Sequence, residues 1–387
     1  MSKEFIPFAL PDIGEAEIDA VTRTLQSGWV TTGPETRAFE EEFAQFLGCD
    51  VSCIAVNSAT AGLHLALESL GIGLGDEVIA PSLTFTATVE IVRYLGGDPV
   101  LVDVDPKTLN MDPAKIRAAI TKKTKAIMPV HYAGLACNMT EILAIANEFG
   151  LKVVEDAAHA LPTTYHGNLV GTLESDVTVF SFYANKTITT GEGGMIVTRS
   201  SELAERMRLM RLHGIDRDAF DRFRSTKPAW YYEVVAPGYK YNLTDVAAAM
   251  GRVQLTRLAE FVKRREQLAS RYHAELSSLP LILPDIGLQG DTHAWHLYVI
   301  RLSDAALKRG FVRDNVIQAL SDRGIGTSVH YVPLHRQPYW RDRYQLEPEQ
   351  FPISEQAYQT MITIPLYTKM TNEHQSRIIG ALVEILE

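Results

Sequence analysis

Three short segments of the sequence carry the residue types that would bind a phosphate, a heteroaromatic ring and a carbonyl compound. The first covers residues 57–62, where the small polar sequence NSATAG separates an apolar run from a helical pattern. Backbone amides at such a helix start can hold a phosphate. Taken alone, the pattern favours a capping turn, in which Ser58 or Thr60 simply satisfies the first amides. The sequence contains no GxGxxG and no GxxxxGK motif, which argues against a dinucleotide fingerprint and a P-loop.

The second segment places a carboxylate, Asp156, directly after the apolar run KVVE at residues 152–155. A carboxylate at the end of a buried strand is costly unless a cation or several donors meet it. Asp156 could cap the helix that follows, or it could pair with a protonated ring nitrogen. The residues themselves leave both interpretations open.

The third segment places a single lysine, Lys186, between the apolar run at residues 177–182 and a glycine-rich turn at residues 191–194. Such a lysine is usually a solvated loop residue. Its neighbours here are small and mostly uncharged, so partial desolvation is a second possibility. A desolvated lysine has a lowered pKa and becomes an amine nucleophile.

Together, the three segments match the requirements of pyridoxal 5′-phosphate. Lys186 would form the Schiff base, Asp156 would keep the pyridine nitrogen protonated, and the turn at residues 57–62 would hold the phosphate. Phe85, just past another apolar run, could stack on the ring or simply pack in the core.

The surrounding sequence predicts the elements that bring these segments together. Short apolar runs alternate with helical patterns between residues 50 and 200, which favours an α/β fold with a mostly parallel sheet covered by helices on both faces. Ligands of such sheets bind at the carboxyl ends of the strands, where all three segments fall. The predicted strands cover residues 53–56, 77–80, 100–104, 126–130, 152–155, 177–182 and 195–198.

The flanking regions predict a helical N-terminus and a second, smaller α/β part. Residues 13–26 have apolar side chains at Ile13, Ile18, Val21 and Leu25, close to helical spacing. A long helix is expected over residues 244–276. Beyond it, strands are expected at residues 296–302 and 327–332, with helices between and after them. We therefore expect a large cofactor-binding domain over residues 1–250, including the N-terminal arm, and a small domain over residues 251–387.

Composition narrows the class of protein. The 387 residues carry a formal net charge of −10, so nucleic acid is an unsuitable partner. Three cysteines, Cys49, Cys53 and Cys137, form no CxxC pair, which favours reduced thiols in a cytoplasmic protein and no metal site. No apolar run is long enough to span a membrane.

The motifs, taken together, resemble those of the DegT/DnrJ/EryC1/StrS sugar aminotransferases over essentially the whole chain. This family implies the type I fold of aminotransferases that use pyridoxal phosphate. HAWHL, GIGT and PGYKYNLTD look most like the UDP-4-amino-4-deoxy-L-arabinose aminotransferase branch, whereas FYANKTITTGEGG is also close to GDP-perosamine synthases. The resemblance rests on NSATAGLHLAL, GDEVIAPSLTFTAT, PVHYAG, VVEDAAHA, FSFYANKTITTGEGGMIVT and VHYVPLHRQPYW.

The resemblance implies roles for individual residues. Lys186 and Asp156 match the catalytic lysine and the carboxylate on the pyridine nitrogen. His159 and Phe85 match positions beside the ring. Lys240 and Asn242 fall where many relatives have the Asn and Arg of GYNYR, a segment expected to reach the phosphate in the neighbouring subunit. Because this sequence lacks that arginine, Lys240 is left as a single positive charge for the phosphate. Phosphate contacts are expected from Thr60, Ala61 and Ser181.

The expected reaction is a ping-pong transfer of the amino group of L-glutamate to C4 of a nucleotide-linked 4-keto sugar, with UDP favoured. The product would serve a cell-surface polysaccharide or lipid A, and a homodimer would share its active sites. Alternatives are a 3-keto sugar or keto-cyclitol substrate, or a catalytically idle binding or regulatory relative. Candidates for substrate contact, each with a structural alternative, are Trp29, Thr31, Tyr183, His330 and Tyr331.

Overall fold

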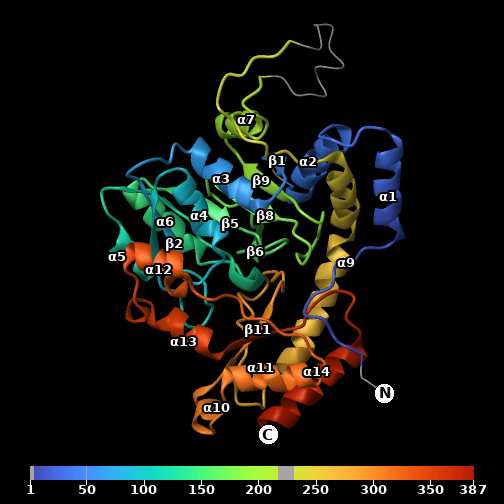
Figure 1. Ribbon diagram of the computed structural model, residues 1–387, viewed down its shortest axis with the longest axis vertical. Helices are drawn as coiled ribbons and strands as arrows, with labels where there is room; N and C mark the ends of the chain where they lie inside the picture. The colour runs from blue at the N-terminus through green and yellow to red at the C-terminus, as the bar shows by residue number, and fades with distance from the viewer. Residues whose placement is uncertain (1–3, 49, 217–230) are drawn as a thin grey trace.

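The computed structural model describes residues 4–48, 50–216 and 231–387 (Figure 1). Cys49 lies outside these residues. The main sheet has seven strands in the order β1-β9-β8-β5-β4-β2-β3. Each of the seven predicted runs forms one of them. The strands are β1 Ser52–Val56, β2 Glu77–Pro81, β3 Asp98–Val102, β4 Thr124–Ile127, β5 Lys152–Asp156, β8 Val177–Ser181 and β9 Gly194–Thr198.

The sheet is mostly parallel, as predicted. Strands β8, β5, β4, β2 and β3 pair in parallel, whereas β9 is antiparallel to both of its neighbours, β1 and β8. The parallel strands and β1 therefore end at the same edge. The turn after β1, Asp156 at the end of β5 and the loop after β8 all lie at this edge.

Successive strand residues point to opposite faces of the sheet, and in these strands the residues on both faces are apolar. Helices therefore cover both faces. Val154 packs in a cluster with α3, α4 and α7, whereas its neighbour Val153 packs with α5 and α6. On that second face, Phe43 of α2 meets Phe180 of β8 with ring centroids 5.4 Å apart. The helices are α2 Pro34–Leu47, α3 Ala59–Ser69, α4 Ala87–Tyr94, α5 Pro113–Ala119, α6 Met139–Phe149 and α7 Ser201–Met210.

Helix α9, Asp245–Leu276, links the main sheet to a second sheet (Figure 1). It begins at the residue after its cap Thr244, close to the predicted start. The second sheet has the antiparallel order β10-β11-β12. The division into domains near residue 250 stays a prediction. The second sheet and its surrounding elements are β10 Leu281–Ile282, β11 Tyr298–Leu302, β12 Met361–Ile364, α10 Asp304–Lys308, α11 Arg313–Asp322, α13 Pro352–Thr360 and α14 Asn372–Leu386. Helix α12, Pro338–Tyr344, instead packs on the main sheet, where its Trp340 joins the cluster of α3 and α4.

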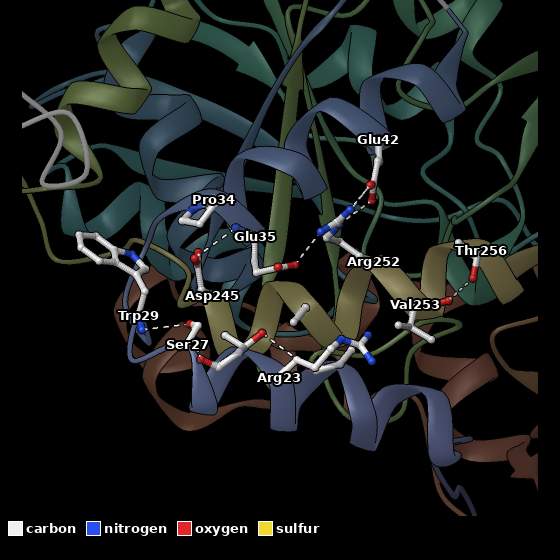
Figure 2. Close-up of a pocket in the computed structure, with 13 residues that line it drawn as sticks. Arg23, Ser27, Trp29, Pro34, Glu35, Glu42, Asp245, Arg252, Val253 and Thr256 are labelled. Atoms are coloured by element: carbon white, nitrogen blue, oxygen red, sulfur yellow. Dashed lines mark hydrogen bonds and ion pairs between the residues drawn. The ribbon is translucent and has the colours of Figure 1, made fainter. Parts of the chain in front are cut away.

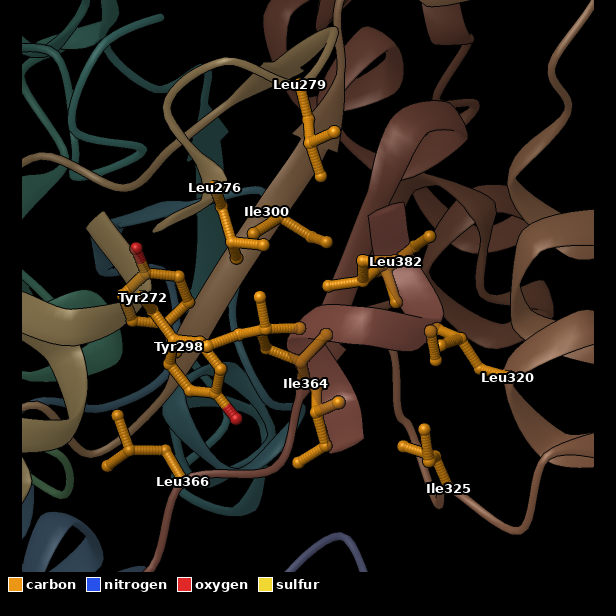
Figure 3. Packing of buried hydrophobic residues seen from close by; sticks show 14 of the residues in the cluster. Tyr272, Leu276, Leu279, Tyr298, Ile300, Leu320, Ile325, Ile364, Leu366 and Leu382 are labelled. Carbon is orange, nitrogen blue, oxygen red and sulfur yellow. The ribbon is translucent and has the colours of Figure 1, made fainter. Parts of the chain in front are cut away.

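A separate hydrophobic cluster holds this second part together (Figure 3). Tyr272 of α9 and Tyr298 of β11 lie with ring centroids 4.9 Å apart, and Ile300 and Leu382 complete the contact with α14. Ile6, from the N-terminal segment, is fully buried in the same cluster. A hairpin of β6 Thr164–Tyr165 and β7 Asn168–Leu169 lies in the connection between β5 and β8.

Two expectations about local structure were wrong. Residues 327–332 do not form a strand: only Ser328 pairs with Thr363, after which the chain leaves the sheet. The helix α1, Glu15–Gln26, forms as predicted, but Ile18 and Leu25 are 51% and 55% exposed. The face of α1 against α9 instead buries Glu17, whose carboxylate binds Arg257 at 2.8 Å. Among the described residues, no helix is long and apolar enough to cross a membrane.

Candidate active site

A cavity of about 460 Å³ lies at the carboxyl edge of the main sheet. It contains Lys186 and Asp156, and it brings together most of the side chains predicted to act there. Nine predicted residues line the cavity: Thr60, Phe85, Asp156, His159, Ser181, Tyr183, Lys186, His330 and Tyr331.

Lys186 extends into this cavity from the loop that follows β8. Its backbone N–H donates to the carbonyl of Tyr183 at 2.9 Å, which forms a tight turn. Its Nζ lies 3.4 Å from Nε2 of His296. Burial lowers the pKa of Lys186 to about 8, with the Asp156 carboxylate acting in the opposite direction. A substantial share of the amine is therefore unprotonated at a mildly alkaline pH, as an amine nucleophile requires.

Asp156 ends β5 and is 6% exposed. Its Oδ2 accepts a hydrogen bond from the Thr88 hydroxyl at 2.8 Å, and Oδ1 accepts one from the N–H of Ala158 at 3.1 Å. Burial raises the pKa of Asp156, while these two bonds and the charge of Lys186 oppose the rise. The carboxylate thus has the donors that hold it in place and still faces the cavity.

The turn between β1 and α3 has free donors for a phosphate. The first N–H groups of a helix have no partner within the helix, and the Ser58 hydroxyl takes up only that of Ala61, at 3.1 Å. Gly194 lies against this turn, where a Cβ would meet the nitrogen of Ala59 at 2.8 Å. The glycine therefore allows β9 to approach the helix start. A cradle of amides, a carboxylate and a lysine around one cavity fit pyridoxal phosphate.

His159 and Tyr331 form one wall of the cavity. Nδ1 of His159 accepts a hydrogen bond from the N–H of Ala133 at 3.2 Å, and Nε2 lies 2.9 Å from the hydroxyl of Tyr331. Burial, together with the charges of Lys186 and His330, lowers the pKa of His159 well below its usual range. His159 is therefore neutral, with its proton on Nε2. Phe85, 57% exposed, stands at the mouth with its ring centroid 5.9 Å from that of Tyr331.

Other predicted residues do not line this cavity. Trp29 borders a different pocket between α1, α2 and α9 (Figure 2), and its Nε1 donates to the carbonyl of Thr32 at 3.1 Å. Thr31 lies in the same turn, with its carbonyl accepting from the N–H of Asp245. Ala61 is buried under the helix start. Their roles at a ligand stay predictions.

Lys240 and Asn242 lie beside the end of β1. Asn242 forms a bridge with Val56, and its side-chain amide donates to the hydroxyl of Thr32 at 2.6 Å. The side chain of Lys240 is exposed, while its carbonyl accepts from the Asn57 amide at 3.3 Å. Both residues are thus near the phosphate cradle but outside the cavity of their own chain. Their contact with a neighbouring subunit stays a prediction.

Sequence reasoning missed two residues that touch the central pair. Thr88 holds Asp156 and His296 meets Lys186, although they are 68 and 110 positions away in the sequence. Thr88 sits within the motif TFTAT and His296 within HAWHL, motifs that in the sequence serve only as markers of the family resemblance.

The sequence of residues 11–383 matches the family described as the DegT/DnrJ/EryC1/StrS aminotransferase family. The chain belongs to this family. It is 46% identical, over 99% of its length and 97% of the relative's, to the spore coat polysaccharide biosynthesis protein SpsC of Bacillus subtilis.

Solved structures agree with this assignment. The putative sugar aminotransferase Spr1654 of Streptococcus pneumoniae, in its PMP-form, is similar with a TM-score of 0.91 and 34% identity, over 98% of both chains. PseC of Helicobacter pylori, an aminotransferase involved in the biosynthesis of pseudoaminic acid, is similar with a TM-score of 0.89 and 28% identity, over 99% of both chains. The chain is thus a transaminase with the type I fold, and pyridoxal 5′-phosphate is its cofactor.

Proposed function

We propose that this aminotransferase moves the amino group of L-glutamate to C4 of a nucleotide-linked 4-keto sugar, most suitably a UDP sugar, to give a 4-amino sugar for a cell-surface polysaccharide or lipid A. The observation that carries the proposal is the convergence of Lys186, Asp156 and the β1–α3 turn on one cavity. The relatives support a sugar substrate, because Spr1654 is named a putative sugar aminotransferase and SpsC is named for polysaccharide biosynthesis.

The cofactor, when bound, supplies a protonated ring that withdraws electrons from the carbon next to the transferred nitrogen. Lys186 would hold it through its ε-amino group and, once free, would take up the proton from the α-carbon of the donor and return it at C4′ of the cofactor. Its lowered pKa, about 8, suits both the uptake and the return of that proton. Asp156 keeps the proton on the ring nitrogen by charge and hydrogen bonding.

The other wall of the cavity would orient the substrates. His159 is held by Ala133 and Tyr331, so its ring has a fixed direction beside the cofactor ring. Phe85 and Tyr183, 57% and 48% exposed, offer aromatic surface at the entrance to the sugar and its nucleotide. His330, whose Nδ1 lies 3.0 Å from the Thr363 hydroxyl, and Tyr331 would contact the sugar itself.

Charge supports the proposal of a homodimer with shared active sites. Of the described residues that line the cavity, Lys186 is the only lysine or arginine, and its amine is used in the reaction. A cofactor phosphate and a nucleotide diphosphate together bring several negative charges. Cations from a second copy of the chain would balance them, and Lys240 is exposed beside the cradle. Two-fold homo-oligomers are the commonest assemblies.

Trapping the cofactor tests the assignment of Lys186. The loaded protein is reduced with borohydride, digested and analysed by mass spectrometry. We expect the cofactor mass on the peptide that contains Lys186, and no trapped cofactor in Lys186→Ala. Lys107→Ala, which removes a lysine paired with Asp285 outside the cavity, is the matched control and should be labelled as the wild type is. A tag on another lysine would refute the assignment.

A panel of substrates tests which carbon of the sugar is aminated and which nucleotide the sugar carries. The protein, with glutamate as donor, is offered 4-keto and 3-keto sugars on UDP, GDP and dTDP, together with a keto-cyclitol, and the products are analysed by NMR. We expect a 4-amino product, formed fastest from a UDP sugar. Exclusive amination at C3 or of the cyclitol would replace the proposed substrate by the alternative one.

Mixed dimers test the sharing of sites. Lys186→Ala and Lys240→Ala are mixed after both are found to be impaired. If Lys240 acts in the partner's site, each mixed dimer has one intact site, and activity returns to about a quarter of the wild-type level. If Lys240 acts within its own chain, or at no site, mixing gives no gain.

A further inference from the structure

We propose that His296 is a positioning residue for Lys186: its Nε2 holds the ε-amino group in the cavity, accepting a hydrogen bond from the ammonium form and donating one to the free amine. The inference rests on the role of Lys186 proposed above. Within the described chain, His296 is the one hydrogen-bond partner of Nζ, at 3.4 Å. His296 itself is 4% exposed and lies just ahead of β11.

The contrast with His159 supports a double role for this imidazole. The proton of His159 is fixed on Nε2, because its Nδ1 accepts from a backbone N–H. Nδ1 of His296 is buried and has no partner among the described residues. The second nitrogen of a histidine normally decides which nitrogen carries the proton. Without that constraint, Nε2 of His296 can act as an acceptor or as a donor.

The surroundings keep the imidazole neutral, which both actions require. Burial lowers the pKa of His296 well below its usual range, and the nearby charges of Lys186 and Arg265 act in the same direction. The ring of His159 lies beside it, with centroids 4.3 Å apart. Among the described residues, no carboxylate is one of the groups that shift the pKa of His296.

The backbone around His296 is held from two sides. Nη1 of Arg265, on α9, donates to the carbonyls of Trp295, His296 and Leu366 at 3.0, 3.4 and 3.2 Å. On the other side, Ala294 and Leu297 donate to the carbonyls at residues 134 and 133. Because the backbone that carries His296 is fixed in this way, its imidazole can return the mobile lysine side chain to the same place after each release.

The test measures Lys186 in the cofactor-free protein. Acetic anhydride acylates neutral amines, so the rate of labelling of the Lys186 peptide against pH, followed by mass spectrometry, gives the pKa of this lysine. A hydrogen bond to the charged form is the stronger one, so its loss should lower that pKa. We expect His296→Leu to lower it by about one unit, a tenfold change in the ratio of ammonium to amine. His296→Gln, which keeps a donor and an acceptor, should stay near the wild type.

A second measurement separates a role of His296 in positioning Lys186 from a role in folding. The rate of the glutamate half-reaction should fall about 10- to 100-fold in His296→Leu and recover in His296→Gln, with KM for the sugar unchanged. His293→Leu is the matched control: His293 is buried in the same segment and accepts from the N–H of Trp295 at 2.8 Å, but does not touch Lys186.

Three results would overturn the proposal: an unchanged labelling profile in His296→Leu, the same shift in His296→Gln, or the same shift in His293→Leu. Failure of the proposed function is a separate result, because it would appear as a borohydride tag on another lysine while the labelling profile still reports on His296.

Discussion

The hydroxyl of Thr88 donates a hydrogen bond to Oδ2 of Asp156, with the two atoms 2.8 Å apart. Thr88 belongs to α4, and Asp156 ends β5, two strands away from the strand that precedes this helix. A second hydroxyl, that of Thr84, lies 2.8 Å from the Thr88 hydroxyl. Both threonines are buried. A short chain of two hydroxyls therefore supports the carboxylate, and Thr84 itself lines the cavity.

Thr88→Val should raise the acid limit of cofactor binding, which is the pH below which pyridoxal phosphate binds only weakly. Burial raises the pKa of Asp156 and the Thr88 bond opposes that rise, so the valine variant has an even higher pKa. Its carboxylate is protonated at a pH where the wild type is still charged. Titration of pyridoxal phosphate by absorbance across pH 4–8 should show binding about tenfold weaker near the acid limit, since a hydrogen bond to a buried charge is worth about 1.5–3 kcal/mol.

Thr88→Ser is the control for this prediction, because it keeps the hydroxyl and loses only a methyl group. It should keep the wild-type acid limit even if its melting temperature falls. Equal acid limits in the valine variant and the wild type would mean that the bond does not tune Asp156.

Asp156→Asn should abolish most of the catalytic rate while leaving the fold intact. The amide keeps the shape: its oxygen can accept from the N–H of Ala158, and its NH2 group, in place of Oδ2, can donate to the Thr88 hydroxyl, but it no longer supplies a charge to the ring nitrogen. We expect the rate of the glutamate half-reaction to fall by about 10²–10³-fold, the range found when one preorganised electrostatic group is removed. Stopped-flow absorbance measures this rate. A fall of less than fivefold would remove Asp156 from the proposed mechanism.

The position of the site could be predicted because parallel strands end at one edge. Asp156 and Lys186 each follow an apolar run, and β5 and β8 prove to be neighbours in the sheet. The carboxyl-end rule for such sheets therefore brought both side chains to one cavity without knowledge of the topology.

The contacts that tune these side chains could not be predicted, because they depend on tertiary packing. Local sequence gives no sign that His296 returns to Lys186 from before β11. The β-like pattern of residues 327–332 was misleading because the backbone leaves the second sheet after Ser328: His330 meets Thr363 of β12 only through its side chain, and the Tyr331 hydroxyl turns to His159 at the cavity. The apolar spacing of α1 was misleading too, because its packed face uses an ion pair between Glu17 and Arg257.

Asp245→Ala should destabilise the protein strongly. The carboxylate of Asp245, at the start of α9, accepts from the N–H groups of Gly33 and Thr36 at 2.7 and 3.0 Å and from the Thr36 hydroxyl at 2.7 Å, so that it caps α2. It also accepts from the N–H of Glu35 at 3.1 Å (Figure 2). It is 1% exposed. Removal leaves these donors buried and unpaired, at a cost of about 3 kcal/mol. The change in the free energy of unfolding is measured by urea denaturation.

Thr244→Ala is the neighbouring control for Asp245→Ala. The Thr244 hydroxyl only caps its own helix, accepting from the N–H of Ala247 at 3.3 Å. Its loss should cost about 1 kcal/mol, as for an ordinary helix cap. If the two variants were equally stable, the link between α2 and α9 would contribute nothing beyond a cap.

Stability should fall in acid through Glu355 of α13. A hydrogen bond from Arg336, at 2.7 Å, and others from His335 and Gln359 lower the pKa of Glu355 to about 2, although burial opposes them. Since the folded value lies below the unfolded value of 4.5, this contribution is complete above pH 4.5 and is lost as the pH falls toward 2. Glu355→Gln should therefore lower the free energy of unfolding at pH 7 by about 1–2 kcal/mol and flatten its decline between pH 4.5 and 2.

Glu148→Gln is the control: Glu148 also pairs with an arginine, Arg117, but both side chains are about half exposed, so the pair is screened by solvent. Urea denaturation at several pH values compares the two, and equal acid profiles would contradict the prediction.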